Sequence, residues 1–338
     1  MQNYDIKNFI YKFLAYLEIE KNRSLATVKN YKFYLFRFSN WATDRHIDNP
    51  EKIILEDITE YRLWLNRLKD AKGKTLKKST QNYHLIALRA FFKYLSKIDV
   101  KILAPEKIEL GKMQERDISF IEGPELERFL NAPLTSSNVP SFKEEEKQII
   151  PQSPHQKIDA KELNLIALRD KAILETLFST GLRVSELVNL KIEQVDLKDM
   201  SSAQELTVRG KGSKVRIVFL SNQALYWIKK YLTLRYNISP YIFASHDQGS
   251  KKRKNILEPL TARTVQRIVK KYAKIAGITK KISPHTLRHS FATNLLANEA
   301  DIRSVQTMLG HSSITTTQIY THITDKHLRE AFIKHHKR

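Results

Sequence analysis

The stretch ELTVRGKGSKVRIVFL at residues 205–220 is the clearest departure from helical periodicity in this chain of 338 residues. Residues 205–208 and 215–220 flank the sequence RGKGSK, and two strand-like segments around a glycine-containing turn predict an antiparallel hairpin. On both sides of the hairpin, apolar residues recur at three- and four-residue spacing, which is typical of amphipathic helices. We therefore expect a mainly α fold, with a helical-bundle N-terminal domain and a mostly helical C-terminal domain that contains a small antiparallel β-sheet.

The expected helices fall into two groups. The upstream group occupies 5–19, 24–41, 56–69 and 79–97, and the downstream group occupies 124–131, 162–179, 183–189, 222–235, 261–276, 284–297, 301–309 and 313 to the end. Between the groups lies a charged stretch with Pro105, which is typical of a linker. We assign the first domain to 1–102, the linker to 103–118 and the second domain to 119–338. Residues 131–160 hold four of the ten prolines and little periodicity, so we predict a flexible insertion there.

The composition excludes several kinds of chemistry and of cellular location. The chain contains no cysteine, which excludes disulfides, cysteine-ligated zinc, iron–sulfur clusters and thiol catalysis. The N-terminal MQNYDIKNFIYKFLAYLE mixes charges among its apolar residues, unlike a signal peptide, and no apolar run is long enough for a membrane span. We expect a soluble, cytoplasmic protein with no membrane partner.

The charge of the chain favours a polyanionic partner. The net charge is +22, and residues 211–290 alone hold 18 basic and 2 acidic residues, interleaved with apolar and aromatic ones. A folded basic surface of this density suits the phosphate backbone of nucleic acid. Two alternatives stay open: a basic surface without function and, less favoured because no helix divides cleanly into basic and apolar sides, an anionic membrane surface.

Four stretches of the second domain hold residues suited to phosphate chemistry: TGLRVSEL (180–187), GKGSKVR (210–216), SPHTLRHSFAT (283–293) and LGHSSITTTQIYTH (309–322). Taken singly, each has an ordinary explanation as a salt bridge, a turn or a helix cap. Taken together, they can hold and activate a phosphodiester.

The chemistry follows from the residue types. SPHTLRH begins a helix whose unpaired N–H groups favour an anion, and His285 and Arg288 lie three residues apart beside that end. Arg183 can supply a second guanidinium, so that two forks stabilise a pentacoordinate transition state. Lys211 on the hairpin turn can protonate the leaving oxygen, and a tyrosine hydroxyl can be the nucleophile. The four stretches contain no carboxylate cluster for a divalent metal, which argues against two-metal nuclease chemistry.

In this order, TGLRVSEL, GKGSKVR, HTLRH, LGH and the tyrosine nine residues after the LGH histidine resemble the tyrosine recombinase (phage integrase) family, and within it the Xer-type site-specific recombinases. The resemblance covers nearly the whole chain and implies a core-binding, SAM-like DNA-binding domain followed by a catalytic domain. It also implies the roles of the site residues, which are the first catalytic arginine Arg183 with its supporting Glu186, the general acid Lys211, the pair His285 and Arg288, the second histidine His311, and the nucleophile Tyr320.

The resemblance suggests further contacts. Lys214 and Arg216, in the hairpin, are expected to bind DNA phosphate without a catalytic role. Arg263, in LTARTVQRIVKKY, falls where the family places a helix in the major groove, and a base contact and a phosphate contact are equally open for it. The C-terminal tail has an apolar helical side, and whether it docks on a neighbouring subunit or on its own domain stays open.

The implied reaction is a transesterification that uses neither ATP nor a metal or other cofactor. It passes through a 3′-phosphotyrosyl intermediate and a Holliday junction held by four subunits. The implied partners are double-stranded DNA with a specific recombination site, further copies of the chain or a second recombinase, and, as for some relatives, a DNA translocase. Resolution of chromosome dimers near the nucleoid is the favoured role. The alternatives are a mobile-element integrase or excisionase, a type IB topoisomerase-like relaxase, and a non-catalytic DNA-binding regulator on the same fold.

Overall fold

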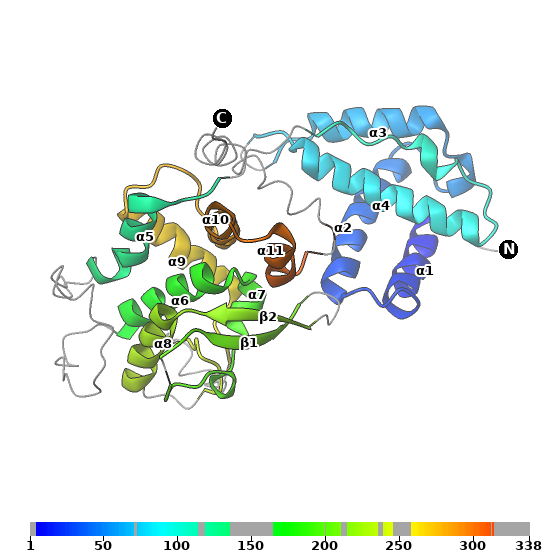
Figure 1. Ribbon diagram of the computed structural model, residues 1–338. Coiled ribbons are helices and arrows are strands. Elements are labelled where there is room, and N and C mark those ends of the chain that lie inside the picture. Colours follow the sequence, from blue (N-terminus) through cyan, green and yellow to red (C-terminus); the bar gives the residue numbers. More distant parts are fainter. Residues whose placement is uncertain are drawn as a thin grey trace, which may run out of the picture. The chain divides into compact units, whose positions relative to one another are not determined.

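The computed structural model describes residues 5–70, 73–113, 119–135, 165–199, 201–210, 215–235, 239–245, 258–311 and 313. The chain divides into two compact units, Met1–Arg116 and Asp117–Arg338 (Figure 1). Both units are mainly helical, and the described strands form one two-stranded antiparallel sheet. The expected mainly α fold is thus confirmed. Among the described helices, none is long and apolar enough to cross a membrane.

The first unit is a bundle of α1 (Ile6–Ile19), α2 (Leu25–Thr43), α3 (Leu55–Arg67) and α4 (Lys78–Lys97), with a short 3-10 helix at Pro50–Lys52. Asp5 and Ser24 cap α1 and α2, because their side-chain oxygens accept hydrogen bonds from backbone N–H groups of the first turn. Large aromatic side chains fill the core where the helices meet, among them Phe13, Phe38, Trp41, Tyr61, Phe91 and Phe92.

Part of the stretch expected to be a linker packs against the first unit. Ile108, after a 3-10 helix at Pro105–Lys107, is fully buried in the core of the bundle. Asn82 of α4 exchanges two hydrogen bonds with the backbone of Gly111, at 2.8 and 3.0 Å. The segment therefore extends the first unit up to about Gly111. Nothing in the sequence indicates this packing, because the segment has no periodic apolar pattern.

The second unit is built around α6 (Leu165–Thr180), which is buried along most of its length. It packs against α5 (Gly123–Thr135), α8 (Asn222–Leu234), α10 (Pro284–Ala297) and the sheet strand β2 (Val215–Leu220). The hairpin pairs β2 with β1 (Gln204–Arg209), with Gln204 opposite Leu220 and Arg209 opposite Val215. The remaining elements are α7 (Val184–Val188), α9 (Ala262–Ile275), α11 (Ile302–Leu309) and a 3-10 helix at Ile192–Gln194.

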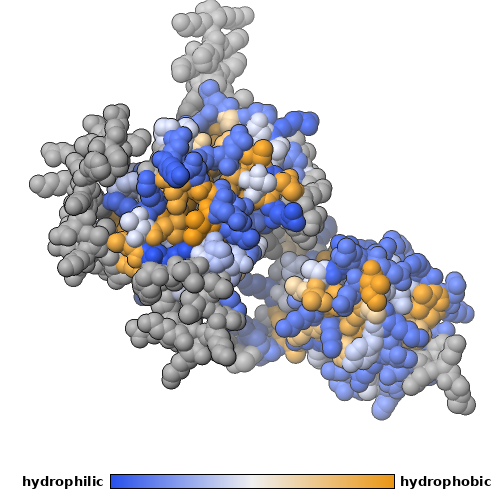
Figure 2. Space-filling model, turned by 90° about the horizontal axis from the view of Figure 1, so that it is seen from below, coloured by the Kyte–Doolittle hydropathy of each residue, from blue (hydrophilic) through white to orange (hydrophobic). Residues whose placement is uncertain are grey.

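Alternate side chains of β2 point in opposite directions. Val218 and Leu220 are buried, whereas Val215, Ile217 and Phe219 on the outer side are 42–59% exposed. The space-filling view correspondingly shows apolar side chains among hydrophilic ones on the protein surface (Figure 2). The period-two pattern therefore assigns one side of β2 to the core.

The start of the insertion differs from the expectation. Helix α5 continues through Pro133 to Thr135, whereas the sequence pattern placed 131–160 in a flexible insertion. Ala132, Pro133 and Leu134 are buried, so packing keeps the last turn helical although proline lacks a backbone donor. The prediction is wrong for residues 131–135, and 136–160 lie outside the described residues.

Helix α6 carries charged side chains into the interior of the second unit. Arg169 donates two hydrogen bonds to Asp170 at 2.8 and 3.0 Å, and the hydroxyl of Tyr272 on α9 donates to the same carboxylate at 3.0 Å. Lys171 pairs with Glu175 and also donates to Asn131 of α5 at 2.9 Å. Because a buried charge is tolerated only when it is paired and hydrogen-bonded, these contacts set the position of α6 relative to α5 and α9.

We expect Gly181→Ala to destabilise the protein much more than Gly277→Ala. Both glycines have positive φ, +59° and +72°, so alanine costs about 1 kcal/mol at either position. A Cβ at 181 would also come within 2.4 Å of the Phe291 ring, whereas a Cβ at 277 meets nothing within 4 Å. Overpacking adds roughly 1–3 kcal/mol at 181. Chemical denaturation of the two variants measures the difference, and equal losses would contradict this packing of α6 against α10.

Candidate active site

The turn after α6 places an arginine and a glutamate side by side. Gly181 has a positive φ of +59°, and Arg183 precedes the first turn of α7. The Glu186 carboxylate accepts a hydrogen bond from the Arg183 backbone N–H at 2.8 Å and another from its Nη1 at 3.0 Å. The glutamate thus both caps α7 and orients the guanidinium, which keeps a side-chain exposure of 29%.

Arg216 reaches the same carboxylate from β2. Its Nη1 and Nη2 donate to the two oxygens of Glu186 at 2.9 and 2.6 Å, and its Nε donates to the carbonyl of Met308 at 2.8 Å. The side chain is only 7% exposed. The expectation that Arg216 binds DNA phosphate is therefore corrected, because its guanidinium is buried and directed at Glu186 and α11.

Glu186 is held ionised by its two partners. Burial alone would raise its pKa, but the hydrogen bonds from Arg216 and Arg183 outweigh burial and bring the pKa below its ordinary value. A carboxylate that accepts several charge-assisted hydrogen bonds is stabilised in its charged form. At neutral pH the site therefore contains a buried anion between two arginines.

Helix α10 carries the HTLRH motif. Ser283 caps its start by accepting a hydrogen bond from Thr286 N–H at 3.3 Å, and Pro284 occupies the first turn. His285 is exposed, whereas Arg288 is 4% exposed. Nη1 of Arg288 donates to the Gly181 carbonyl at 2.8 Å. The two residues are thus not equally accessible, although their spacing placed them on one side of the helix.

The C-terminal end of α11 brings the arginines together. Gly310 ends the helix in the left-handed conformation, with φ of +64°. The last carbonyls of a helix have no partner within it and form the negative end of its dipole, so they favour cationic donors. Three consecutive carbonyls here each accept a hydrogen bond from a different arginine: Met308 from Arg216 (2.8 Å), Leu309 from Arg288, and Gly310 from Arg183 (3.2 Å).

Three histidines lie close to this cationic cluster. Although the His285 side chain reaches solvent, partial desolvation of its ring, followed by the charges of Arg288 and Arg183, lowers its pKa. Burial and neighbouring positive groups lower the pKa of both His289 and His311 to about 4. At neutral pH these imidazoles are therefore uncharged and able to accept a proton. No role was predicted for His289, although it is the second histidine of HTLRH.

The outer side of α9 is strongly basic. Val265, Ile268, Val269, Tyr272 and Ala273 of this helix are buried. Arg263 lies on the opposite, exposed side, which also presents Arg267, Lys270, Lys271 and Lys274. Such a row of cations on a rigid helix can follow a nucleic-acid backbone.

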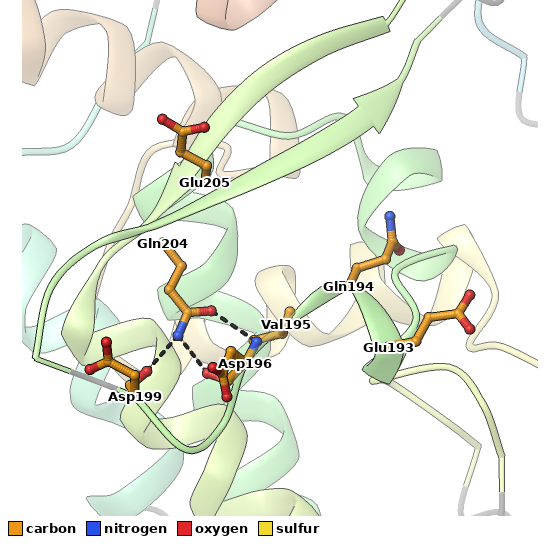
Figure 3. Close-up of a pocket in the computed structure, with 7 residues that line it drawn as sticks. All are labelled: Glu193, Gln194, Val195, Asp196, Asp199, Gln204 and Glu205. Carbon is orange, nitrogen blue, oxygen red and sulfur yellow. Dashed lines mark hydrogen bonds between the residues drawn. The ribbon is translucent and has the colours of Figure 1, made fainter.

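A separate hollow of about 440 Å³ has the opposite charge. It is lined by Glu193, Gln194, Val195, Asp196, Asp199, Gln204 and Glu205 (Figure 3). The Gln204 side-chain amide donates to the backbone carbonyls of Asp196 and Asp199 and accepts from the N–H of Asp196. The hollow's carboxylates repel phosphate, and none of the arginines or histidines of the cluster lines it, so it is not the candidate site.

Three of the predicted residues lie outside the described residues. They are Lys211 and Lys214, between the two strands in the sequence, and Tyr320, the predicted nucleophile. The described part of the site consists of Arg183, Glu186, Arg216, His285, Arg288, His289 and His311.

Comparison with protein families agrees with the two-unit organisation. The phage integrase family model matches residues 143–327. A second model, for the N-terminal SAM-like domain of phage integrases, matches residues 10–97. Together the two models cover most of both units.

Curated relatives match over nearly the full length. Tyrosine recombinase XerC of Thermodesulfovibrio yellowstonii is 35% identical over 329 residues, which are 97% of this chain and 96% of the relative. Tyrosine recombinase XerD of Lacticaseibacillus casei is 32% identical, over 96% of this chain and 97% of the relative.

Solved structures show the same fold. The XerH site-specific recombinase bound to a palindromic difH substrate has a TM-score of 0.64 at 22% identity, over 92% of this chain and 80% of XerH. A lambda integrase dimer bound to a COC′ core site has a TM-score of 0.63 at 17% identity, over 92% of this chain and 97% of the integrase chain.

We expect His289 and His311 of the DNA-free protein to stay neutral down to about pH 4. The unfolded chain takes up these protons near pH 6.5. The free energy of unfolding from these groups should thus be constant above about pH 6.5 and fall as the pH falls to about 4. NMR titration of the ring resonances measures the pKa values, and denaturation at pH 7 and pH 5 measures the stability. His311→Gln should weaken this pH dependence; ring midpoints at 6 or above would contradict the prediction.

Proposed function

Because this chain belongs to the phage integrase family, we propose that the cluster of arginines and histidines at the end of α11 is the active site of a DNA strand-transfer enzyme. The protein is a tyrosine site-specific recombinase, in agreement with its family and with the names of its curated relatives. Its substrate is DNA, and its reaction is the cutting and rejoining of DNA strands at a recombination site.

The observation that carries the assignment of the site is the convergence of arginines beside neutral imidazoles. Arg183 lies immediately before α7 and Arg288 lies in α10, and both donate hydrogen bonds to carbonyls at the end of α11. We assign the phosphate contact to Arg183, the more exposed of the two. Arg288 adds its positive charge from the interior, where a low dielectric strengthens its attraction for the developing phosphorane charge.

The nucleophile and the general acid are proposed from the motifs. The Tyr320 oxygen forms a bond to the scissile phosphorus, and the bond from phosphorus to the 5′ oxygen breaks. Lys211 gives a proton to the departing 5′ oxygen, and a neutral imidazole, at His285 or His311, takes the proton of the tyrosine hydroxyl. The 5′-hydroxyl of a partner strand then attacks the phosphotyrosyl bond and releases Tyr320. No step consumes ATP.

We propose that the biological role is the resolution of chromosome dimers by four subunits on two paired sites. Identity of 32–35% with XerC and XerD proteins over nearly the whole chain supports this role over the integration of a mobile element. The subunits are copies of this chain or include a second recombinase, and a DNA translocase is a candidate activator.

Replacing the nucleophile tests the proposed function. Tyr320→Phe removes the attacking oxygen while leaving the arginines and the basic surface in place. We expect covalent adduct with a nicked suicide substrate to be abolished and the affinity for the same DNA to change by less than about twofold, since one hydroxyl contributes little to a backbone-dominated interface. Denaturing gel electrophoresis detects the adduct.

A second tyrosine of the same unit provides the control. Tyr241, which is only partly exposed and is described outside the cluster, should retain adduct formation when replaced by phenylalanine. An undiminished adduct in Tyr320→Phe would overturn the choice of nucleophile, and absence of adduct in the wild-type protein on every site tested would overturn the function.

The exposed basic side of α9 allows a test of whether Arg263 contacts a base or a phosphate of DNA. If Arg263 reads a base, Arg263→Ala should weaken binding to the preferred site by about 1–3 kcal/mol and change non-specific binding much less. Lys274→Ala, at the other end of the same exposed side, should weaken binding to all sequences about equally. Binding isotherms on specific and scrambled duplexes at fixed salt measure both effects. Equal losses on both duplexes for Arg263→Ala would assign it a phosphate contact.

A further inference from the structure

We propose that Arg216 is a positioning residue for catalysis, which acts through Glu186 to set the orientation and the effective charge of Arg183. The inference rests on the proposed function, because it concerns how the same site activates a scissile phosphate. It assigns to Arg216 a role that differs from a DNA contact.

Arg216 occupies a position that the strand pattern reserves for apolar residues. It lies on the inner side of β2 with Val218 and Leu220, both fully buried. A charged side chain at such a position is costly unless it is paired with an opposite charge and hydrogen-bonded. Here Nε, Nη1 and Nη2 all have acceptors, at 2.8, 2.9 and 2.6 Å. A residue kept there at this cost, with an acceptor for each of its three guanidinium nitrogens, points to a specific role.

The role follows from which donors bind each carboxylate oxygen of Glu186. Oε1 accepts from Nη1 of Arg183 and Nη1 of Arg216, and Oε2 accepts from the backbone N–H of Arg183 and Nη2 of Arg216. Each oxygen therefore contacts both arginines. The bidentate fork of Arg216 fixes the plane of the carboxylate, and the carboxylate in turn fixes the guanidinium of Arg183.

The charges of Arg183, Glu186 and Arg216 give a second reason to assign Arg216 a positioning role. Arg183 and Glu186 alone would form a neutral pair, with the carboxylate close to where a phosphate must bind. Arg216 adds a second positive charge to the same carboxylate, so that the trio carries a net charge of +1. The negative charge of Glu186 is thereby offset, and Arg183 keeps its attraction for the phosphate oxygens.

The same side chain also contacts the end of α11. Nε donates to the Met308 carbonyl, and the Arg216 Cδ lies so near Gly310 that a Cβ there would come within 2.8 Å. The chain that leaves this end carries His311 and then the proposed nucleophile. Arg216 thus connects the phosphate-binding arginine with the origin of the segment that bears Tyr320.

Arg216→Lys is the informative variant. Lysine keeps the charge but has one nitrogen, so it cannot maintain a bidentate fork and a bond to Met308 together. We expect single-turnover adduct formation at saturating protein to slow by about 10–100-fold, the range typical of residues that orient a catalytic group. The affinity for the site and its salt dependence should not change. Arg128→Lys, an exposed arginine on α5, is the matched control and should cleave at the wild-type rate.

A modified substrate separates positioning from a merely structural role. In a methylphosphonate at the scissile position, a methyl group replaces one charged oxygen, so stabilisation by Arg183 contributes less to the rate. The loss caused by Arg216→Lys should therefore shrink on this substrate, in parallel with the loss caused by Arg183→Lys. A variant that is only partly folded would lose the same factor on both substrates.

A double substitution tests the coupling through Glu186 independently of the modified substrate. Glu186→Gln removes the charge through which Arg216 acts, so Arg216→Lys added to it should slow cleavage little further. The inference would be overturned by additive losses in the double variant, by equal losses on both substrates, or by a wild-type rate for Arg216→Lys. It would also be overturned by a salt slope reduced by about one, as expected for a lost phosphate contact. Failure of the wild-type protein to form any adduct would instead overturn the proposed function.

Discussion

The candidate site depends on the carbonyls at the end of one short helix, which accept hydrogen bonds from arginines in place of helical N–H groups. Three arginines from three separate elements bond to Met308, Leu309 and Gly310 of α11. Bringing guanidinium groups together is electrostatically unfavourable, and the negative end of a helix offsets part of that repulsion. Glu186 offsets more of it, since it is paired with two of the three. The cluster is thus assembled before any phosphate arrives, which reduces the reorganisation that binding would otherwise require.

The buried helix α6 helps to position the arginine cluster. Its paired charges fix it against α5 and α9, and its last residues lead into the Gly181 turn. That turn supplies the carbonyl that holds Arg288 and, two residues later, Arg183 itself. Because the turn joins the core directly to the site, errors in packing of α6 would appear as misplaced arginines.

Much of the fold was predictable from local patterns. Helical periodicity and caps such as Ser24 and Ser283 placed the helices, and the segments around RGKGSK placed the hairpin. The last turn of α5 was missed because tertiary packing overrides the local effect of Pro133. The packing of Ile108 on the first unit was missed because a single buried residue leaves no periodic signal.

The site was predictable in part. The motifs identified Arg183, Glu186 and Arg288, which the structure brings together. Arg216 was misread because basic residues near a hairpin turn suggest phosphate contacts, yet alternation along β2 places it with Val218 on the inner side. The burial of Arg288 depends on long-range contacts that spacing cannot reveal. The roles of Lys211, Lys214 and Tyr320 stay predictions, since these residues lie outside the described part of the chain.

The cations exposed on α9 and the buried Arg216 differ in how strongly dissolved salt affects them. The row on α9 is solvent-exposed, so dissolved ions compete with it directly, whereas Arg216 and Glu186 are nearly inaccessible to counterions. Raising the ionic strength therefore loosens the hold of the exposed row on a polyanion long before it disturbs the internal pairs. Release of DNA from the exposed row therefore does not require Arg216 and Glu186 to separate, and the internal pair is already in place when another duplex binds.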